Sequence, residues 1–198
     1  MLKRIIIFTL IILLLLPSCS WSKEKRIIEN IEKTYKKYEG YICLAEINMK
    51  INEVESKYLI EEEYISAAEY KLEILEPKES RGITIQYTDD KIFIEHPSIE
   101  QSISMAAIKS LNDQLTIGDF FENISNATLK GTEKIDSIEY LIFNYDLPNK
   151  NKYKDSAKVW IKKKGFTPYK LNILDDNDKL IIEIIYDDFK FLEKDKNK

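Results

Sequence analysis

The sequence contains few of the residues that build metal centres, disulfide frameworks and phosphate-binding loops. Its 198 residues include one histidine, two cysteines and five glycines. A conventional zinc site combines several His or Cys ligands, and this composition cannot supply them once one cysteine is modified. The glycines are scattered and form no Gly-rich loop of the kind that binds phosphate. We therefore expect neither a cofactor nor a metal.

Long apolar runs are equally scarce, because the only pronounced one is the twelve-residue stretch from Ile5 to Leu16, which follows Lys3 and Arg4. A helix that spans a bilayer needs roughly 20 apolar residues, so this run is short for that role. Its length and its positive flank are typical of the core of a signal peptide that is later removed. A retained membrane anchor is the alternative.

The residues after this run are Leu16-Pro17-Ser18-Cys19. They look like a lipobox, in which the cysteine thiol receives a diacylglycerol and the peptide bond before it is cut. This predicts cleavage between Ser18 and Cys19, lipid on Cys19, and stable anchoring through two or more acyl chains. An ordinary signal peptide with an incidental cysteine is the other interpretation. We expect 1–18 to be the signal peptide and 19–25 a lipidated tether.

The charge pattern argues against nucleic-acid binding. The formal net charge of −4 becomes −6 when Lys3 and Arg4 are removed, leaving 28 basic and 34 acidic residues. Both signs are mixed along the chain, so no basic stripe suits a phosphate backbone.

Cys43 is the only thiol left once Cys19 is lipidated. Strand alternation places it on one face with Tyr41, Ala45 and Ile47, which predicts a buried cysteine that packs as a small hydrophobe. A disulfide between two chains is the alternative.

Hydrophobic periodicity predicts an α+β domain over 26–192, followed by a charged tail at 193–198. An amphipathic helix is expected over 26–39, with Gly40 as its stop. Two short helices are expected near the middle, one over 103–111 and one that begins after Thr116 as N-cap. The predicted strands are 41–51, 58–67, 69–75, 83–87, 91–95, 127–133, 140–146, 157–163, 169–174 and 179–191. One antiparallel sheet, strongly curved over the helices, would bury both sets of apolar faces.

Several segments match a known pattern of closing hairpins: Lys158-Val159-Trp160-Ile161-Lys162, Gly165 to Leu171, Asp178-Lys179-Leu180 and Glu183 to Phe189. Pro77, Gly82, the Asp90-Lys91 turn and Pro97 match the middle of the same pattern. Over roughly residues 26–191 the chain resembles the LolA/LolB-like superfamily of half-barrels. Within that superfamily, it is most similar to the clostridial spore germination lipoproteins of the GerS type.

This resemblance implies a role in the spore envelope. The partner that it implies is the spore-cortex amidase CwlD, an N-acetylmuramoyl-L-alanine amidase that takes part in muramic-δ-lactam formation. LolA-type carriers also use an arginine near the cavity mouth. The mature chain offers only Arg26, at a helix start, and Arg81, in a turn-like segment, and neither can be assigned to that role.

No catalytic constellation is evident in the sequence. His96 stands alone between Glu95 and Pro97, without partners that would orient it for acid–base chemistry. The carboxylate groups are interpreted as solvated charge at turns and strand ends: Glu61-Glu62-Glu63, Asp89-Asp90, Asp175-Asp176 and Asp187-Asp188. We therefore predict no catalytic residue and no enzyme.

Two aromatic residues are expected on otherwise polar strand faces. Phe93 shares its face with Lys91 and Glu95, and Trp160 shares its face with Lys158 and Lys162. Such residues are candidate anchors for a partner, unless the second face of the sheet is covered as well. Unpaired strand edges are a further candidate surface, through which two copies could pair or exchange strands.

The prediction is thus a non-catalytic, lipid-anchored protein on the extracytoplasmic face that supports a cell-wall amidase. The alternative is a carrier or sensor of lipid or lipoprotein that uses the concave apolar face of the sheet.

Overall fold

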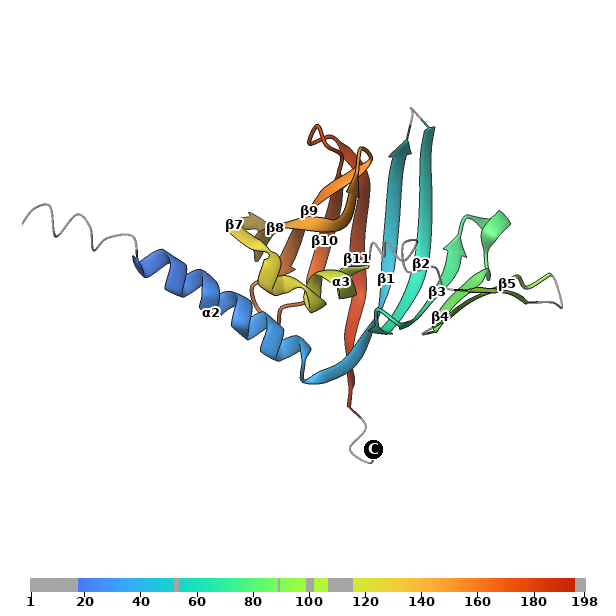
Figure 1. The fold of residues 1–198 in the computed structure, drawn as a ribbon, viewed down its shortest axis with the longest axis horizontal. Coiled ribbons are helices and arrows are strands. Elements are labelled where there is room, and N and C mark those ends of the chain that lie inside the picture. Colours follow the sequence, from blue (N-terminus) through green and yellow to red (C-terminus); the bar gives the residue numbers. More distant parts are fainter. Residues whose placement is uncertain (1–17, 52–53, 89, 99–101, 107–115, 195–198) are drawn as a thin grey trace, which may run out of the picture.

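The computed structural model describes residues 18–51, 54–88, 90–98, 102–106 and 116–194. In this part of the chain, strands form one antiparallel sheet in the order β6-β5-β4-β3-β2-β1-β11-β10-β9-β8-β7 (Figure 1). Their bounds are β1 Tyr38–Ile51, β2 Val54–Ser66, β3 Glu69–Glu76, β4 Thr84–Thr88, β5 Lys91–Glu95, β6 Ile103–Ala106, β7 Thr128–Ile135, β8 Ile138–Asn151, β9 Lys154–Lys162, β10 Pro168–Leu174 and β11 Leu180–Glu193. The last strand therefore pairs with the first, at the centre of the sheet.

Among the described residues, two α-helices and two 3₁₀ turns accompany the sheet: α2 (Ser18–Tyr35), η1 (Lys78–Ser80), α3 (Ile117–Glu122) and η2 (Ile124–Asn126). The sheet curls around α3 and the C-terminal part of α2, while strands β3 to β5 extend away as a separate arm (Figure 1). This confirms the predicted α+β fold, an open and strongly curved LolA-like half-barrel.

Strict alternation along the strands decides which side chains face the concave side. In β9, Ala157, Val159 and Ile161 are almost fully buried and belong to the core. Successive side chains of a strand point to opposite faces, so the residues between them lie on the convex side. The same rule places Tyr41, Cys43 and Ala45 of β1 in the core.

The N-terminal helix differs from the predicted one at both ends. It begins at Ser18 and includes the segment 19–25, which was expected to be a tether, and it ends at Tyr35. Strand β1 begins at Tyr38, whose ring stacks on Phe191 at 4.5 Å between centroids. Gly40 is therefore not a helix stop. It lies in β1, where an added Cβ would stand 2.0 Å from the carbonyl oxygen of Tyr64, so only glycine allows this close approach to β2.

The prediction of a helix over 103–111 is wrong for residues 103–106. Ile103–Ala106 forms β6 and pairs with β5, Ile103 opposite Ile94. This segment is a strand because its backbone pairs with the edge of β5. The spacing of apolar residues in the sequence does not show that this edge is available. The remainder of that prediction lies outside the described residues.

Cys19 and Ser18 are the first residues of α2, and the predicted signal peptide otherwise lies outside the described residues. In the part of the chain that the structure describes, no helix is both long and apolar enough to cross a membrane.

Candidate functional site

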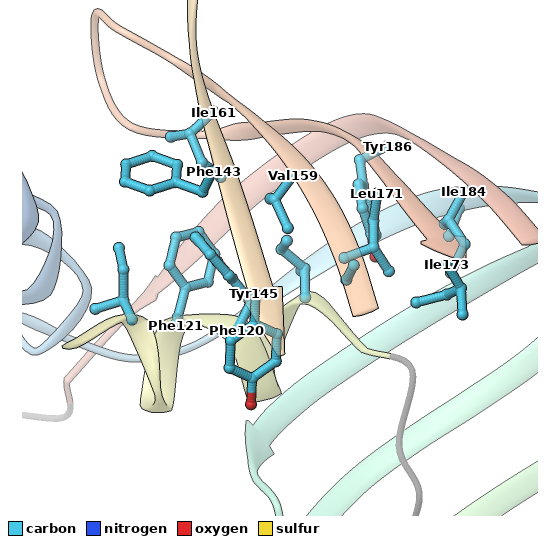
Figure 2. Packing of buried hydrophobic residues seen from close by; sticks show 14 of the residues in the cluster. Phe120, Phe121, Phe143, Tyr145, Val159, Ile161, Leu171, Ile173, Ile184 and Tyr186 are labelled. Atoms are coloured by element: carbon cyan, nitrogen blue, oxygen red, sulfur yellow. The ribbon is translucent and has the colours of Figure 1, made fainter. Parts of the chain in front are cut away.

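Helix α3 fills the concave face of the sheet with two adjacent aromatic side chains. The Phe120 ring lies 5.6 Å from that of Phe143 and 6.0 Å from that of Tyr145, both on β8. Figure 2 shows Phe120 and Phe121 among the aliphatic and aromatic residues of strands β8 to β11. Both phenylalanines are at most 2 % exposed. The surface that a half-barrel could offer to a ligand is occupied here by the protein itself.

Helix α2 packs behind α3 and completes this layer. Tyr35 stacks on Phe121 with ring centroids 4.8 Å apart, and Ile31 is fully buried. Thr116 is the N-cap of α3, as predicted, because its hydroxyl oxygen accepts the Asp119 N–H at 3.4 Å.

A buried hydrogen-bond chain joins α3 to the sheet. The Gly118 N–H donates to the Tyr41 hydroxyl at 3.0 Å, and this hydroxyl donates to a carboxyl oxygen of Glu62. Glu62 lies in the middle of β2, opposite Cys43 of β1, and is 3 % exposed. The chain thus connects the first turn of α3, β1 and β2 inside the core.

Burial changes the protonation of this carboxyl. Desolvation raises the pKa of Glu62 to about 7, although the hydrogen bond from Tyr41 favours the ionised form and acts in the opposite direction. Desolvation and the nearby Glu62 also raise the pKa of Tyr41 and Tyr186 well above the usual value. The core therefore contains a carboxyl group that can exchange a proton near neutral pH.

A second network holds the other end of α3. The Tyr64 hydroxyl donates to Glu122 at 2.9 Å, and the Ala67 N–H donates to the same carboxyl oxygen at 3.3 Å. The Tyr64 ring also stacks on that of Tyr41, with centroids 5.2 Å apart. Both ends of α3 are thereby attached to the β1–β2 hairpin.

Gly118 of α3 lies close against the Tyr64 ring of β2, so a single added methyl group at this position should destabilise the fold. An added Cβ would lie 2.3 Å from the Tyr64 ring. Glycine-to-alanine changes within helices normally stabilise, but overpacking here is expected to lower the free energy of unfolding by about 1–3 kcal/mol. Urea denaturation of Gly118→Ala measures the change, with the exposed Ser125→Ala as control. Stability equal to or above that of the wild type would contradict the packing of Tyr64 on Gly118.

The sequence interpretation of the Glu61-Glu62-Glu63 run as solvated charge is wrong for its middle residue. Glu61 and Glu63 are exposed, whereas Glu62 shares the inner face of β2 with Ile60 and Tyr64. The alternation Ile60, Glu62, Tyr64 was the available signal. Asp175 behaves as predicted, since its carboxylate accepts the Asn177 and Lys179 N–H groups in a turn.

The remaining candidate residues form no reactive centre in the described part of the chain. Cys43 is 2 % exposed, as predicted for a structural thiol, and desolvation raises its pKa far above the usual value. The His96 ring accepts the Ser98 N–H at 3.1 Å. Among the described residues, no three His, Cys, Asp or Glu side chains gather as they would around a metal ion. Arg81 lies at the η1 turn, where its side chain donates to the Leu75 carbonyl at 2.8 Å.

Trp160 is on the convex face, as expected, but it is not an exposed anchor. Its side chain is only 5 % exposed, and its indole N–H donates to Glu133 at 2.8 Å. The ammonium groups of Lys158 and Lys170 lie 4.9 and 4.3 Å from its ring centroid and cover it. Phe93 is half-buried on β5, between Gln86 of β4 and Ser104 of β6. The two predicted anchors are therefore in different parts of the sheet.

Comparison with known proteins places the chain among relatives of this fold. A protein family described as "Sporulation protein YdcC-like" matches residues 2–198. The sporulation protein YdcC of Bacillus subtilis (strain 168) is 19 % identical over 187 residues, which are 92 % of this chain and 54 % of that protein. The chain therefore spans about half the length of this relative.

Two solved structures are also similar. A Vibrio parahaemolyticus domain assigned to outer membrane lipoprotein sorting is 13 % identical, with a TM-score of 0.51, over 89 % of this chain and 95 % of that chain. A structure of the CwlD amidase from Clostridioides difficile in complex with the GerS lipoprotein is 24 % identical, with a TM-score of 0.49, over 84 % of this chain and 95 % of that chain.

The match to the family extends over nearly the whole sequence, and the half-barrel agrees in fold with the Vibrio parahaemolyticus domain. The chain belongs to the sporulation protein YdcC-like family.

Proposed function

We propose that this protein is a non-catalytic lipoprotein of the spore envelope that binds and supports a cortex-modifying N-acetylmuramoyl-L-alanine amidase. By resemblance the partner is CwlD, and the role is muramic-δ-lactam formation, which germination requires. Membership in a sporulation family supports the process. The lipobox-like Leu16-Pro17-Ser18-Cys19 supports export, cleavage after Ser18 and a palmitate-type anchor on Cys19.

The occupied concave face is the observation that carries this proposal. Phe120 and Phe121 fill the space that a carrier would need for an acyl chain, and both ends of α3 are hydrogen-bonded to β1 and β2. Because the core fills the concave face beneath α3, the surfaces that remain for a partner are the outer face of the sheet and the arm. Binding a partner is a function that such surfaces can perform without a catalytic centre.

The arm, together with the edge strand β6 beside it, offers an accessible apolar surface for a partner. Ile103 and Met105 of the edge strand β6 are 59 % and 49 % exposed and lie opposite Ile94 and Ile92, on the inner face of the arm. Phe93 lies on the opposite face of the arm. In the part of the chain that the structure describes, β6 is an edge strand, and such an edge can recruit a strand from a second copy. A homodimer through strand pairing or exchange is therefore part of the proposal. Light scattering across micromolar concentrations tests it, and a monomer throughout would remove this part.

The proposed partnership is tested by recovering the affinity-tagged protein from membranes of sporulating cells. We expect a stoichiometric wall amidase by mass spectrometry, and diacylated Cys19 in the N-terminal peptide. The control, Cys19→Ser, should leave the membrane fraction while its purified form still binds the amidase. Absence of any wall enzyme would refute the partnership, and peptidoglycan cleavage by the purified protein alone would refute the non-catalytic role.

The second candidate is a carrier or sensor of lipid or lipoprotein, as the LolA-like fold suggests. The apolar inner face of the arm favours it, because Leu72, Ile74 and Ile92 continue the concave surface beyond α3. Copurified acyl chains in place of an amidase would support this candidate over the first.

A further inference from the structure

Helix α2 connects the predicted lipid site directly to the folded domain. Cys19 is the second residue of α2, which continues without interruption to Tyr35. Five residues further on, a carboxylate oxygen of Glu24 accepts the Leu129 N–H of β7 at 2.8 Å. At about 1.5 Å of rise per helical residue, Cys19 lies only about 8 Å along the helix axis from this contact.

The rest of α2 cannot swing relative to the sheet. Ile31 is fully buried, and Ile27, Ile28 and Tyr35 pack against the same core. Turning the helix would expose these side chains to water and break the stacking of Tyr35 on Phe121. The direction in which α2 leaves the domain is therefore fixed by the core.

The exposed side chains near the start of α2 are predominantly basic. Lys23, Lys25 and Arg26 are all exposed, whereas the carboxylate of Glu24 is directed to β7. Basic residues beside a membrane anchor strengthen its attraction to an anionic lipid surface. This charge suits the surface that lipid on Cys19 would bring close.

The predicted lipid site and the arm lie at opposite ends of the molecule. Along the longest axis, the first turn of α2 lies at one end and the β3–β5 arm lies at the other (Figure 1). We propose that the protein stands on an anionic bilayer by the α2–β7 end, with the arm directed away from the membrane. This rests on the proposed lipid anchor at Cys19.

A fixed orientation would separate the membrane contact from the partner surface. Phe93 and the exposed edge of β6 would face outward, towards a wall enzyme, while the β7 edge beside Glu24 would face the lipid. The distance between the membrane and the partner would then be set by the length of the rigid domain. It would not depend on a flexible tether.

The orientation can be tested on the full precursor expressed in a bacterium and purified from membranes. Two variants, Ser125→Cys in η2 and Gln86→Cys in β4, each receive a thiol-reactive fluorophore at an exposed site. Cys43 is buried and Cys19 would carry lipid, so labelling is confined to the introduced thiol. The proteins are reconstituted in phosphatidylcholine vesicles containing phosphatidylglycerol and a headgroup-nitroxide lipid.

We expect the probe at position 125 to be quenched several-fold more strongly than the probe at position 86. A flexible Gly-Ser insertion between Ser22 and Lys23 should abolish this difference while vesicle binding persists, and the same insertion after Lys194 should leave it unchanged. Equal quenching of both probes in protein with acylated Cys19 would overturn the orientation alone. Mass spectrometry that finds no acyl group on Cys19 would overturn the anchor, and the orientation with it.

Discussion

Replacing Phe120 with alanine is expected to lower the free energy of unfolding by about 3–5 kcal/mol. The ring is 1 % exposed and packs against Phe121, Phe143 and Tyr145, so its removal leaves a cavity at the centre of the concave face. Since domains are stable by roughly 5–15 kcal/mol, this single change removes a large part of the total. Guanidinium denaturation followed by far-ultraviolet circular dichroism measures the loss.

The matched control is Phe93→Ala, which removes the same ring from the half-buried arm position. It should cost roughly 1 kcal/mol, because less apolar surface returns to water and no enclosed cavity forms. Comparable losses for the two variants would show that α3 does not fill the core as described. The pair also separates stability from binding, because Phe93→Ala is the variant expected to weaken the amidase complex while the fold persists.

Replacing Glu62 with glutamine is expected to remove a pH dependence of stability on the order of 3 kcal/mol. The folded pKa of about 7 lies above the ordinary value of 4.5 that the unfolded chain retains. Between these values the folded state holds the proton more tightly, so the wild type loses stability as pH rises from about 4.5 to about 7 and stays at the lower level above that. Glu62→Gln stays uncharged throughout this range and should not show this loss.

The titratable groups around Glu62 have raised pKa values, so they do not titrate in the pH range in which Glu62 does. Tyr41 and Cys43 on β1 and Tyr186 on β11 are its titratable neighbours, and burial raises the pKa of all three. Denaturant midpoints of the wild type and Glu62→Gln should converge near pH 4.5 and differ most above pH 7, the variant being the more stable. The exposed Glu63→Gln is the control and should follow the wild type within about 0.5 kcal/mol. A wild type that gained stability on alkalinisation relative to Glu62→Gln would disprove the buried, desolvated carboxyl.

Both predictions concern contacts that hold α3 against the sheet. Phe120 supplies the apolar contact that fills the concave face, and Glu62 supplies, through Tyr41, a polar attachment for the same helix. A buried polar group is costly unless it is hydrogen-bonded, so this attachment specifies where α3 sits at some expense of stability.

The fold class was predictable because strand periodicity is local. The alternating residues of β1 showed both the strand and its buried face, β9 and β11 were predicted as strands, and Asp175 to Asp178 marked a turn. The mistakes fell where pairing across the sheet decides the outcome. Gly40 was interpreted as a helix end but allows β1 to approach β2, and Ile103 was placed in a helix but pairs with β5.

The candidate site residues were likewise predicted correctly where the signal lies within one strand and incorrectly where it depends on contacts between strands. Burial of Cys43 could be predicted from its strand neighbours, whereas Glu62 was missed because three successive glutamates suggest solvent. Trp160 was expected to face a partner, yet Lys158, Lys170 and Glu133 from three different strands enclose it. Contacts between residues distant in sequence produce these environments, and periodicity within one strand does not contain them.

The sequence alone determined that this chain forms an antiparallel α+β domain, because hydrophobic periodicity and turn chemistry are properties of neighbouring positions. Only the tertiary structure decided that α3 fills the concave face, that Glu62 is buried inside the core and that α2 leaves the domain in a fixed direction. Each of these depends on desolvation or on packing between segments far apart in the chain, and the folded arrangement alone brings those segments together.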